Sequence, residues 1–206
     1  MTKTREQTVF VVDDDAAVRD SIAELVDSVG LRAEGYASAS GFLDAFEPER
    51  PGCLVLDVRM ADISGLVLQR RIKALGATIP VIVLTGHGDI PMAVEAMKAG
   101  AVDFLQKPYR DQALLDSINA ALSLDAETRR SIAAADSFER CLAALTERER
   151  EVLDHLLAGR TTKQTAKALE ISPRTAEAHR RNLLRKFGVG SAKELMSVTA
   201  DSGWAT

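Results

Sequence analysis

The chain has 206 residues, of which 46% are hydrophobic and 27% charged, and its formal net charge is −4. This composition predicts a soluble globular protein with a proper core and one large or two small domains. The longest apolar runs are far below the ~18 residues of a membrane span, and the N-terminus lacks a signal-peptide core. The two cysteines, Cys53 and Cys141, are too far apart in sequence to favour a disulfide or a metal pair. We expect a cytoplasmic protein with no membrane partner.

Charge is distributed unevenly along the chain. Residues 141–206 carry 11 basic against 8 acidic side chains, a balance of +3, which leaves −7 for the remainder. An acidic first part and a basic second part predict two domains with different partners. The basic part is a candidate for binding nucleic acid, although a balance of +3 is too small to decide this alone.

Strand and helix patterns alternate over residues 1–122, which predicts an α/β domain with a five-stranded, doubly wound parallel sheet. The strands are short apolar runs bounded by turn residues, and the helices show apolar spacings of three and four. We expect strands at 9–12, 31–36, 53–56, 81–85 and 101–105, and helices at 18–29, 38–46, 66–75, 90–99 and from 111 onward.

Residues 123–142 change in character and predict a helical linker, and the sequence leaves open whether it continues the preceding helix. Residues 143–206 predict a second, all-α domain of four short helices, because helix start signals recur there. Three capping boxes and one serine followed by proline give these starts: Thr146 with Glu149, Thr161 with Gln164, Ser191 with Glu194, and Ser172 with Pro173. The expected helices cover about 147–158, 162–169, 173–187 and 192–200.

Polar side chains follow several strands of the predicted sheet. Asp13 and Asp14 follow the first strand, Asp57 the third, Thr85 ends the fourth, and Lys107 follows the fifth. Ligands of open α/β sheets bind at the carboxyl ends of the strands, so these groups are expected to meet there. Asp57 alone would be read as a helix N-cap. Together, the carboxylates suit a hard cation such as Mg²⁺, and the lysine suits a phosphoryl group, which predicts phosphoryl transfer to a carboxylate.

These residues resemble the receiver domain of bacterial two-component response regulators, which has a flavodoxin-like fold. The resemblance implies Mg²⁺ ligands at Asp13, Asp14, Asp57 and the Arg59 carbonyl, with Asp57 as the phosphoacceptor. It also implies catalytic roles for Lys107 and Thr85, a switch formed by Thr85 and Phe104, and a cis bond to Pro108. One departure is Ala61, where the family commonly has proline, and we expect it to alter loop rigidity.

Two other functions fit parts of this pattern less well. A haloacid-dehalogenase-type phosphatase needs a second aspartate two residues after its nucleophile, where this chain has Arg59. A phosphorylation-independent DNA binder with a degenerate receiver is the alternative reading, but the complete set of strand-end residues argues against it.

The helix that starts at Pro173 carries an apolar stripe on one face and charge on the other. Ala176, His179, Leu183 and Phe187 form the inward stripe, so His179 is expected to be a core residue. With the short helix before it, this helix is a helix-turn-helix candidate, although a solvated charged helix would look similar. Arg181 is suited to guanine, Glu177 to cytosine N4 and Ala178 to a thymine methyl group. Phosphate contacts are predicted at Lys163, Arg174, Arg180 and Arg185.

Residues 145–189 resemble the LuxR-type helix-turn-helix of the NarL/FixJ response regulators. The run Leu145-Thr-Glu-Arg-Glu-Arg-Glu-Val-Leu153 carries this match, and Thr175 joins the predicted DNA-binding residues. Residues 87–104 favour the FixJ branch. Two departures are Thr162, where the family usually has asparagine, and Glu177, where many members have a basic residue.

The two resemblances together imply a regulated transcription factor. Its expected partners are a sensor histidine kinase, double-stranded DNA, a second copy in a phosphorylation-dependent homodimer, and RNA polymerase. Apart from Mg²⁺-dependent self-phosphorylation and dephosphorylation at Asp57, no enzyme activity is expected. An RNA-binding antiterminator is disfavoured because the helical part lacks aromatic stacking residues.

Overall fold

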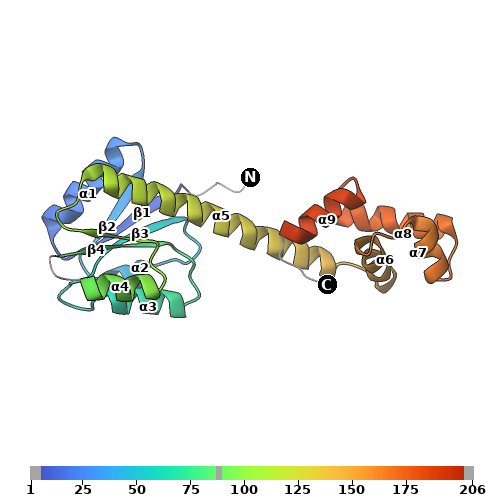
Figure 1. Cartoon of the computed structure of the whole chain (residues 1–206), viewed down its shortest axis with the longest axis horizontal. Coiled ribbons are helices and arrows are strands. Elements are labelled where there is room, and N and C mark those ends of the chain that lie inside the picture. The colour runs from blue at the N-terminus through green and yellow to red at the C-terminus, as the bar shows by residue number, and fades with distance from the viewer. Residues whose placement is uncertain (1–5, 87–89, 202–206) are drawn as a thin grey trace. The chain divides into compact units, whose positions relative to one another are not determined.

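The computed structural model describes residues 6–86 and 90–201 (Figure 1). The chain divides into two compact units between Thr128 and Arg129, inside the segment 123–142 that the sequence predicts to be a linker. The first unit contains β1 (Thr8–Val12), α1 (Ala16–Ser28), β2 (Arg32–Tyr36), α2 (Ala39–Ala45), β3 (Gly52–Asp57), α3 (Gly65–Ala74), β4 (Val81–Thr85), α4 (Ile90–Lys98) and β5 (Asp103–Gln106). Helix α5 (Asp111–Ala143) crosses the boundary, and α6 (Glu147–Leu157), α7 (Thr162–Ala168), α8 (Pro173–Lys186) and α9 (Ala192–Asp201) follow it.

The strands of the first unit form one parallel sheet in the order β2-β1-β3-β4-β5, which confirms the predicted five-stranded, doubly wound architecture. Strands β1, β3 and β4 are buried along their whole length, because helices cover both faces of a parallel sheet. Strand β5 begins two residues later than predicted. Ala101 and Val102 instead close the turn after α4, where their amides donate to the carbonyls of Ala96 and Val81.

Alternate residues of each central strand belong to different cores, one on each face of the sheet. Helices α1 and α5 cover one face, and α2, α3 and α4 cover the other (Figure 1). Leu54 and Leu56 face the α2–α4 side, whereas Cys53 and Val55 face α1 and α5. Burial raises the pKa of the Cys53 thiol to about 12, so Cys53 is an unreactive core residue.

Helix α5 is a single helix of 33 residues, which answers the question that the sequence leaves open about the linker. Asp125 lies in its middle, is fully buried, and accepts a hydrogen bond of 2.9 Å from the Gly52 amide at the start of β3. This contact holds the helix against the sheet beyond the predicted domain end at residue 122. None of the helices in the described part of the chain, α5 included, is apolar enough over sufficient length to span a membrane.

The loop between β3 and α3 is attached to the start of α2 through Asp62. Its carboxylate accepts hydrogen bonds from the Ser40 hydroxyl at 2.9 Å, the Ser40 amide at 3.1 Å and the Ala39 amide at 3.4 Å. These bonds to the Ser40 and Ala39 amides, together with one from Ile63, lower the pKa of Asp62 to about 2. Because this loop follows Asp57 directly, Asp62 helps to fix the end of β3.

We expect Asp62→Ala to lower the free energy of unfolding by up to about 1 kcal/mol at pH 7, since the replaced carboxylate caps free helix amides but is solvent-exposed. A depressed carboxyl pKa contributes stability above its unfolded value near 4, and this contribution disappears as the pH falls toward 2. Urea unfolding of the wild type and of Asp62→Ala at pH 7 and pH 3 measures how much the difference between their free energies of unfolding decreases. Asp44→Ala, at an exposed aspartate of α2, is the matched control. A wild-type to Asp62→Ala difference that stays constant with pH would contradict the capping role.

The second unit confirms the four predicted helices and most of their start signals. Thr146 with Glu149 and Thr161 with Gln164 form complete capping boxes, and Ser172 caps α8 with Pro173 in its first turn. The third predicted box differs. Ser191 Oγ accepts from the Glu194 amide, but the Glu194 carboxylate accepts from the Gly190 amide.

The buried core residues of the second unit come from the end of α5 and from α6, α8 and α9. Phe138 and Leu142 come from the end of α5, and they pack with Leu153 of α6, Leu183 of α8 and Leu195 of α9. Phe138 also contacts the ring of Phe187, with ring centroids 5.2 Å apart. The last turns of α5 are therefore part of the helical unit, because their apolar side chains complete its core.

Candidate functional site

Adjacent strands bring four of the predicted site residues to one edge of the sheet. Val12 pairs with Leu56, so Asp13 and Asp57 follow neighbouring residues of β1 and β3. Asp57 pairs with Leu84, one residue before Thr85. Thr85 in turn pairs with Gln106, and the Lys107 amide donates to the Thr85 carbonyl at 2.7 Å. Parallel pairing therefore places all four residues at the carboxyl edge, as predicted.

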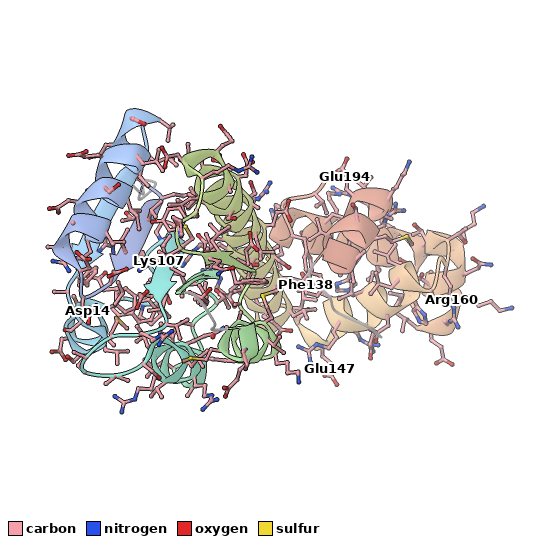
Figure 2. All side chains as sticks on the ribbon, turned by 60° about the vertical axis from the view of Figure 1, so that its left-hand side comes forward. Asp14, Lys107, Phe138, Glu147, Arg160 and Glu194 are labelled. Atoms are coloured by element: carbon pink, nitrogen blue, oxygen red, sulfur yellow. The ribbon has the colours of Figure 1, made fainter. Side chains whose placement is uncertain are left out.

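Lys107 connects the two buried carboxylates. Its Nζ donates to Asp13 Oδ2 at 2.6 Å and to Asp57 Oδ1 at 2.7 Å (Lys107 is labelled in Figure 2). Asp13 is 1% exposed and Asp57 7%, so one ammonium group compensates two carboxylates that are removed from water. Such a shared cation is needed because two close, buried carboxylates repel each other.

The environment of Asp57 makes its carboxylate less acidic than usual. Burial is the main cause that raises its pKa, and the charge of Asp13 acts in the same direction. Lys107 and the Arg59 amide, which donates to Asp57 Oδ2 at 2.7 Å, oppose the shift. Burial on its own lowers the pKa of Lys107, but its bonds to Asp13 and Asp57 outweigh burial and raise it. Asp57 is therefore a desolvated carboxylate held next to a charged ammonium group.

Asp14 lies beside this pair with a partner of its own. Its Oδ2 accepts a hydrogen bond of 3.1 Å from the Ala61 amide, which proline at this position would lack (Asp14 is labelled in Figure 2). The three aspartates offer only oxygen ligands, which suits a hard cation such as Mg²⁺. In the part of the chain that the structure describes, they do not come together as a group of three metal ligands. The donor chemistry thus fits the predicted metal, and Lys107 is the cation that links Asp13 with Asp57.

Gly65 is a residue of this site that the sequence analysis does not single out. A Cβ atom at Gly65 would lie 2.3 Å from the Asp57 carbonyl oxygen and 3.1 Å from Leu56 Cγ. The first turn of α3 therefore approaches the end of β3 as closely as a glycine permits. No local pattern distinguishes this glycine from others that precede helices, because the contact partner is eight residues away.

Helix α8 exposes the face that the sequence predicts for DNA. Six of the predicted residues on it are exposed, Lys163 of α7 is exposed as well, and Ala176 and Leu183 are buried on the opposite side. His179 is partly buried. The exposed predicted residues on α8 are Arg174, Thr175, Glu177, Ala178, Arg181 and Arg185.

Arg180 has a different environment from the other predicted phosphate-binding residues. Its side chain is 31% exposed, and its Nη1 donates to the Thr162 hydroxyl of α7 at 3.1 Å. The Thr162 hydroxyl donates in turn to Glu177 Oε2, also at 3.1 Å. The two positions at which the chain departs from the LuxR-type pattern are therefore in direct contact.

Comparisons with known proteins match each of the two units to a family. Residues 9–119 match the response regulator receiver domain, and residues 143–199 match the bacterial regulatory proteins of the luxR family. The chain is 46% identical over 195 residues to the response regulator protein TodT of Pseudomonas putida, covering 95% of this chain and 86% of TodT. It is 47% identical over 197 residues to the transcriptional regulatory protein FixJ of Azorhizobium caulinodans, covering 96% and 93%.

The chain belongs to the response regulators with a LuxR-type DNA-binding domain. Solved structures support the assignment over the full length. The response regulator StyR is similar with a TM-score of 0.85 at 44% identity, covering 95% of this chain and 98% of StyR. Full-length FixJ from B. japonicum has a TM-score of 0.61 at 41% identity and covers 98% and 100%.

Thr85 and Phe104, the two residues expected to form the switch, lie in different environments. Thr85 is buried, and among the described residues its hydroxyl forms no hydrogen bond with Asp57. Phe104 is 45% exposed on β5, and the Lys107–Pro108 bond is cis. Residues 87–89 of the stretch that favours the FixJ branch lie outside the described residues.

Proposed function

We propose that this response regulator accepts a phosphoryl group on Asp57 from a sensor histidine kinase and that phosphorylation controls its binding to DNA. The observation that carries this proposal is the arrangement of Asp57, Asp13 and Lys107, in which one ammonium group lies within 2.7 Å of both buried carboxylates. A structural salt bridge needs one acid and one base. A second buried acid beside the pair favours a site built to receive additional positive charge and a phosphoryl group.

Asp57, Lys107 and Thr85 have different roles in the proposed phosphoryl transfer. A carboxylate oxygen of Asp57 forms a bond to phosphorus while the bond from phosphorus to the histidine nitrogen of the kinase breaks, and that nitrogen keeps the electron pair. Lys107 neutralises charge on the phosphoryl oxygens, and the Thr85 hydroxyl donates to one of them. Asp13, Asp14, Asp57 and the Arg59 carbonyl would hold Mg²⁺, which supplies further charge neutralisation. Water later hydrolyses the acyl phosphate and restores the Asp57 carboxylate.

The output of the receiver is proposed to be a change in the population of two conformations. Val94 and Met97 of α4 and Phe104 of β5 are exposed large apolar side chains. Arg70 of α3 and Glu95 of α4 form an ion pair beside them. Exposed apolar groups on adjacent elements favour an interface, so we propose that the phosphorylated form dimerises through α4 and β5.

The DNA-binding unit of each protomer then contacts one half of an inverted repeat in double-stranded DNA. Arg181, Glu177 and Ala178 are proposed to contact base edges, with Lys163, Arg174, Thr175 and Arg185 on the phosphate backbone. RNA polymerase is the proposed downstream partner, and the cytoplasm is the proposed location, because the kinase domain, DNA and polymerase meet there.

Intact-mass spectrometry with a small-molecule phosphodonor tests the proposal. Wild-type protein is expected to gain one phosphoryl group in the presence of Mg²⁺ and none when Mg²⁺ is chelated, whereas Asp57→Asn gains none in either condition. Phosphodonor is also expected to increase the DNA affinity of the wild type but not that of Asp57→Asn. An adduct on Asp57→Asn would contradict the assignment. DNA binding that ignores phosphodonor in the wild type would favour the phosphorylation-independent regulator instead.

A further inference from the structure

Three side chains from two helices form a connected polar group on the DNA-facing side of the second unit. Thr162 begins α7, and Glu177 and Arg180 lie one turn apart on α8. The Thr162 hydroxyl accepts from Arg180 Nη1 at 3.1 Å and donates to Glu177 Oε2 at 3.1 Å, so it has both a donor and an acceptor partner. Arg180 Nη1 also lies 4.0 Å from Glu177 Oε2. We name these three residues the Thr162 triad.

Within the triad, the guanidinium group of Arg180 is less accessible than that of an arginine that binds phosphate. Its Nε is buried and has no hydrogen-bond partner in the described part of the chain, and the side chain is 31% exposed. An arginine that binds DNA phosphate presents its donors to solvent in the free protein, as exposed Arg174 and Arg185 do. Arg180 instead directs one end of its guanidinium toward α7.

The same contacts restrict Glu177 in a way that favours base recognition. Glu177 is 50% exposed, Oε2 is held by Thr162, and Oε1 has no hydrogen bond among the described residues. A carboxylate near DNA is repelled by the phosphates, so a neighbouring guanidinium lowers the cost of bringing it into the groove. A fixed carboxylate with one accepting oxygen matches the exocyclic amino group of cytosine, the donor of a C·G pair in the major groove.

We infer that Thr162 and Arg180 are positioning residues that fix Glu177 as the reader of a cytosine, and that Arg180 does not serve as a phosphate contact. This inference rests on the proposed sequence-specific binding of α8 and adds the two residues that position its expected cytosine reader, Glu177. It differs from the sequence-based expectation for Arg180, because the contact to Thr162 depends on how α7 packs against α8.

Selection from a random double-stranded DNA pool, with phosphodonor-treated full-length protein, tests the inference. Glu177→Gln is expected to replace cytosine by another base at one position of each half-site, which identifies the base pair. Thr162→Val and Arg180→Met are expected to reduce the preference for cytosine at that same position by about fivefold or more. Thr162→Ser keeps the hydroxyl and is expected to retain the wild-type preference.

Salt dependence separates positioning from phosphate binding. Lys163→Ala is expected to reduce the slope of log affinity against log salt by about 1 without changing base preference. Arg180→Met is expected to leave that slope unchanged while relaxing preference. A reduced slope with intact cytosine preference in Arg180→Met, or an unchanged preference in Thr162→Val, would overturn the inference.

The outcome for the wild type separates this inference from the proposed function. If wild-type protein selects no sequence at all, the proposed sequence-specific binding fails, and the inference fails with it. The wild type can also select a sequence in which no cytosine preference changes in Glu177→Gln. In that case the proposed function stands and the inference alone is overturned. Thermal unfolding of each variant confirms that its fold is retained, and Thr162→Val remains informative where Arg180→Met does not fold.

Discussion

Replacing Lys107 by methionine is expected to slow phosphoryl transfer to Asp57 by about 100-fold, the effect of removing one preorganised charged donor from a desolvated site. Nζ of Lys107 is the cation that contacts both Asp13 and Asp57. Methionine keeps the length and apolar stem of the side chain, so the loss concerns charge and hydrogen bonding. Mass spectrometry at successive times after phosphodonor addition measures the rate.

The same substitution is expected to lower the free energy of unfolding by about 2 kcal/mol at pH 7, less than for a fully buried ion pair because Lys107 is partly exposed. Without Lys107, burial and the charge of Asp13 both raise the pKa of Asp57 with less opposition. A carboxyl group whose pKa is raised in the folded protein makes the folded state less stable as the pH increases above the unfolded pKa of that group. The deficit is therefore expected to shrink as the pH is lowered from 7 toward that value.

Arg110→Met is the matched control for Lys107→Met, since Arg110 is an exposed basic residue three positions further along the chain. It is expected to leave both the transfer rate and the pH dependence of stability at wild-type values. Equal rates in the two variants would show that Lys107 has no specific role at the site.

Gly65→Ala is expected to lower the free energy of unfolding by about 2 kcal/mol and to slow phosphoryl transfer tenfold or more. A Cβ atom at this position would meet the Asp57 carbonyl oxygen at 2.3 Å. Because that oxygen belongs to the backbone, either α3 or the end of β3 has to move. Movement of β3 displaces the Asp57 carboxylate from Lys107. Urea unfolding and the time course of phosphorylation measure the two effects.

Ser64→Ala provides the comparison for Gly65→Ala, because Ser64 precedes α3 but forms no side-chain capping hydrogen bond. We expect it to leave the transfer rate unchanged. A Gly65→Ala protein that is as stable and as rapidly phosphorylated as Ser64→Ala would mean that the close approach has no functional consequence.

The sequence alone was sufficient for the architecture and for most of the carboxylate site. Strands such as Val81–Thr85 are short apolar runs between helical patterns, and parallel strands end at a common edge. Asp13, Asp57 and Lys107 could therefore be grouped without coordinates. The starts of α6, α7 and α8 were also predictable, since a capping box involves residues only three positions apart.

Only the tertiary structure decided which partners these residues have. The close approach of Gly65 to Asp57, the hydrogen bond from the Ala61 amide to Asp14 and the contact of Thr162 with Arg180 all join separate elements. Helical or strand periodicity reports which face of one element is buried, but not which atoms of another element lie against it. The linker illustrates the same limit, because the packing of Asp125 at β3 and of Phe138 in the helical unit involves atoms of other elements. Local spacing thus determined where the functional groups are, and packing between elements determined what each of them contacts.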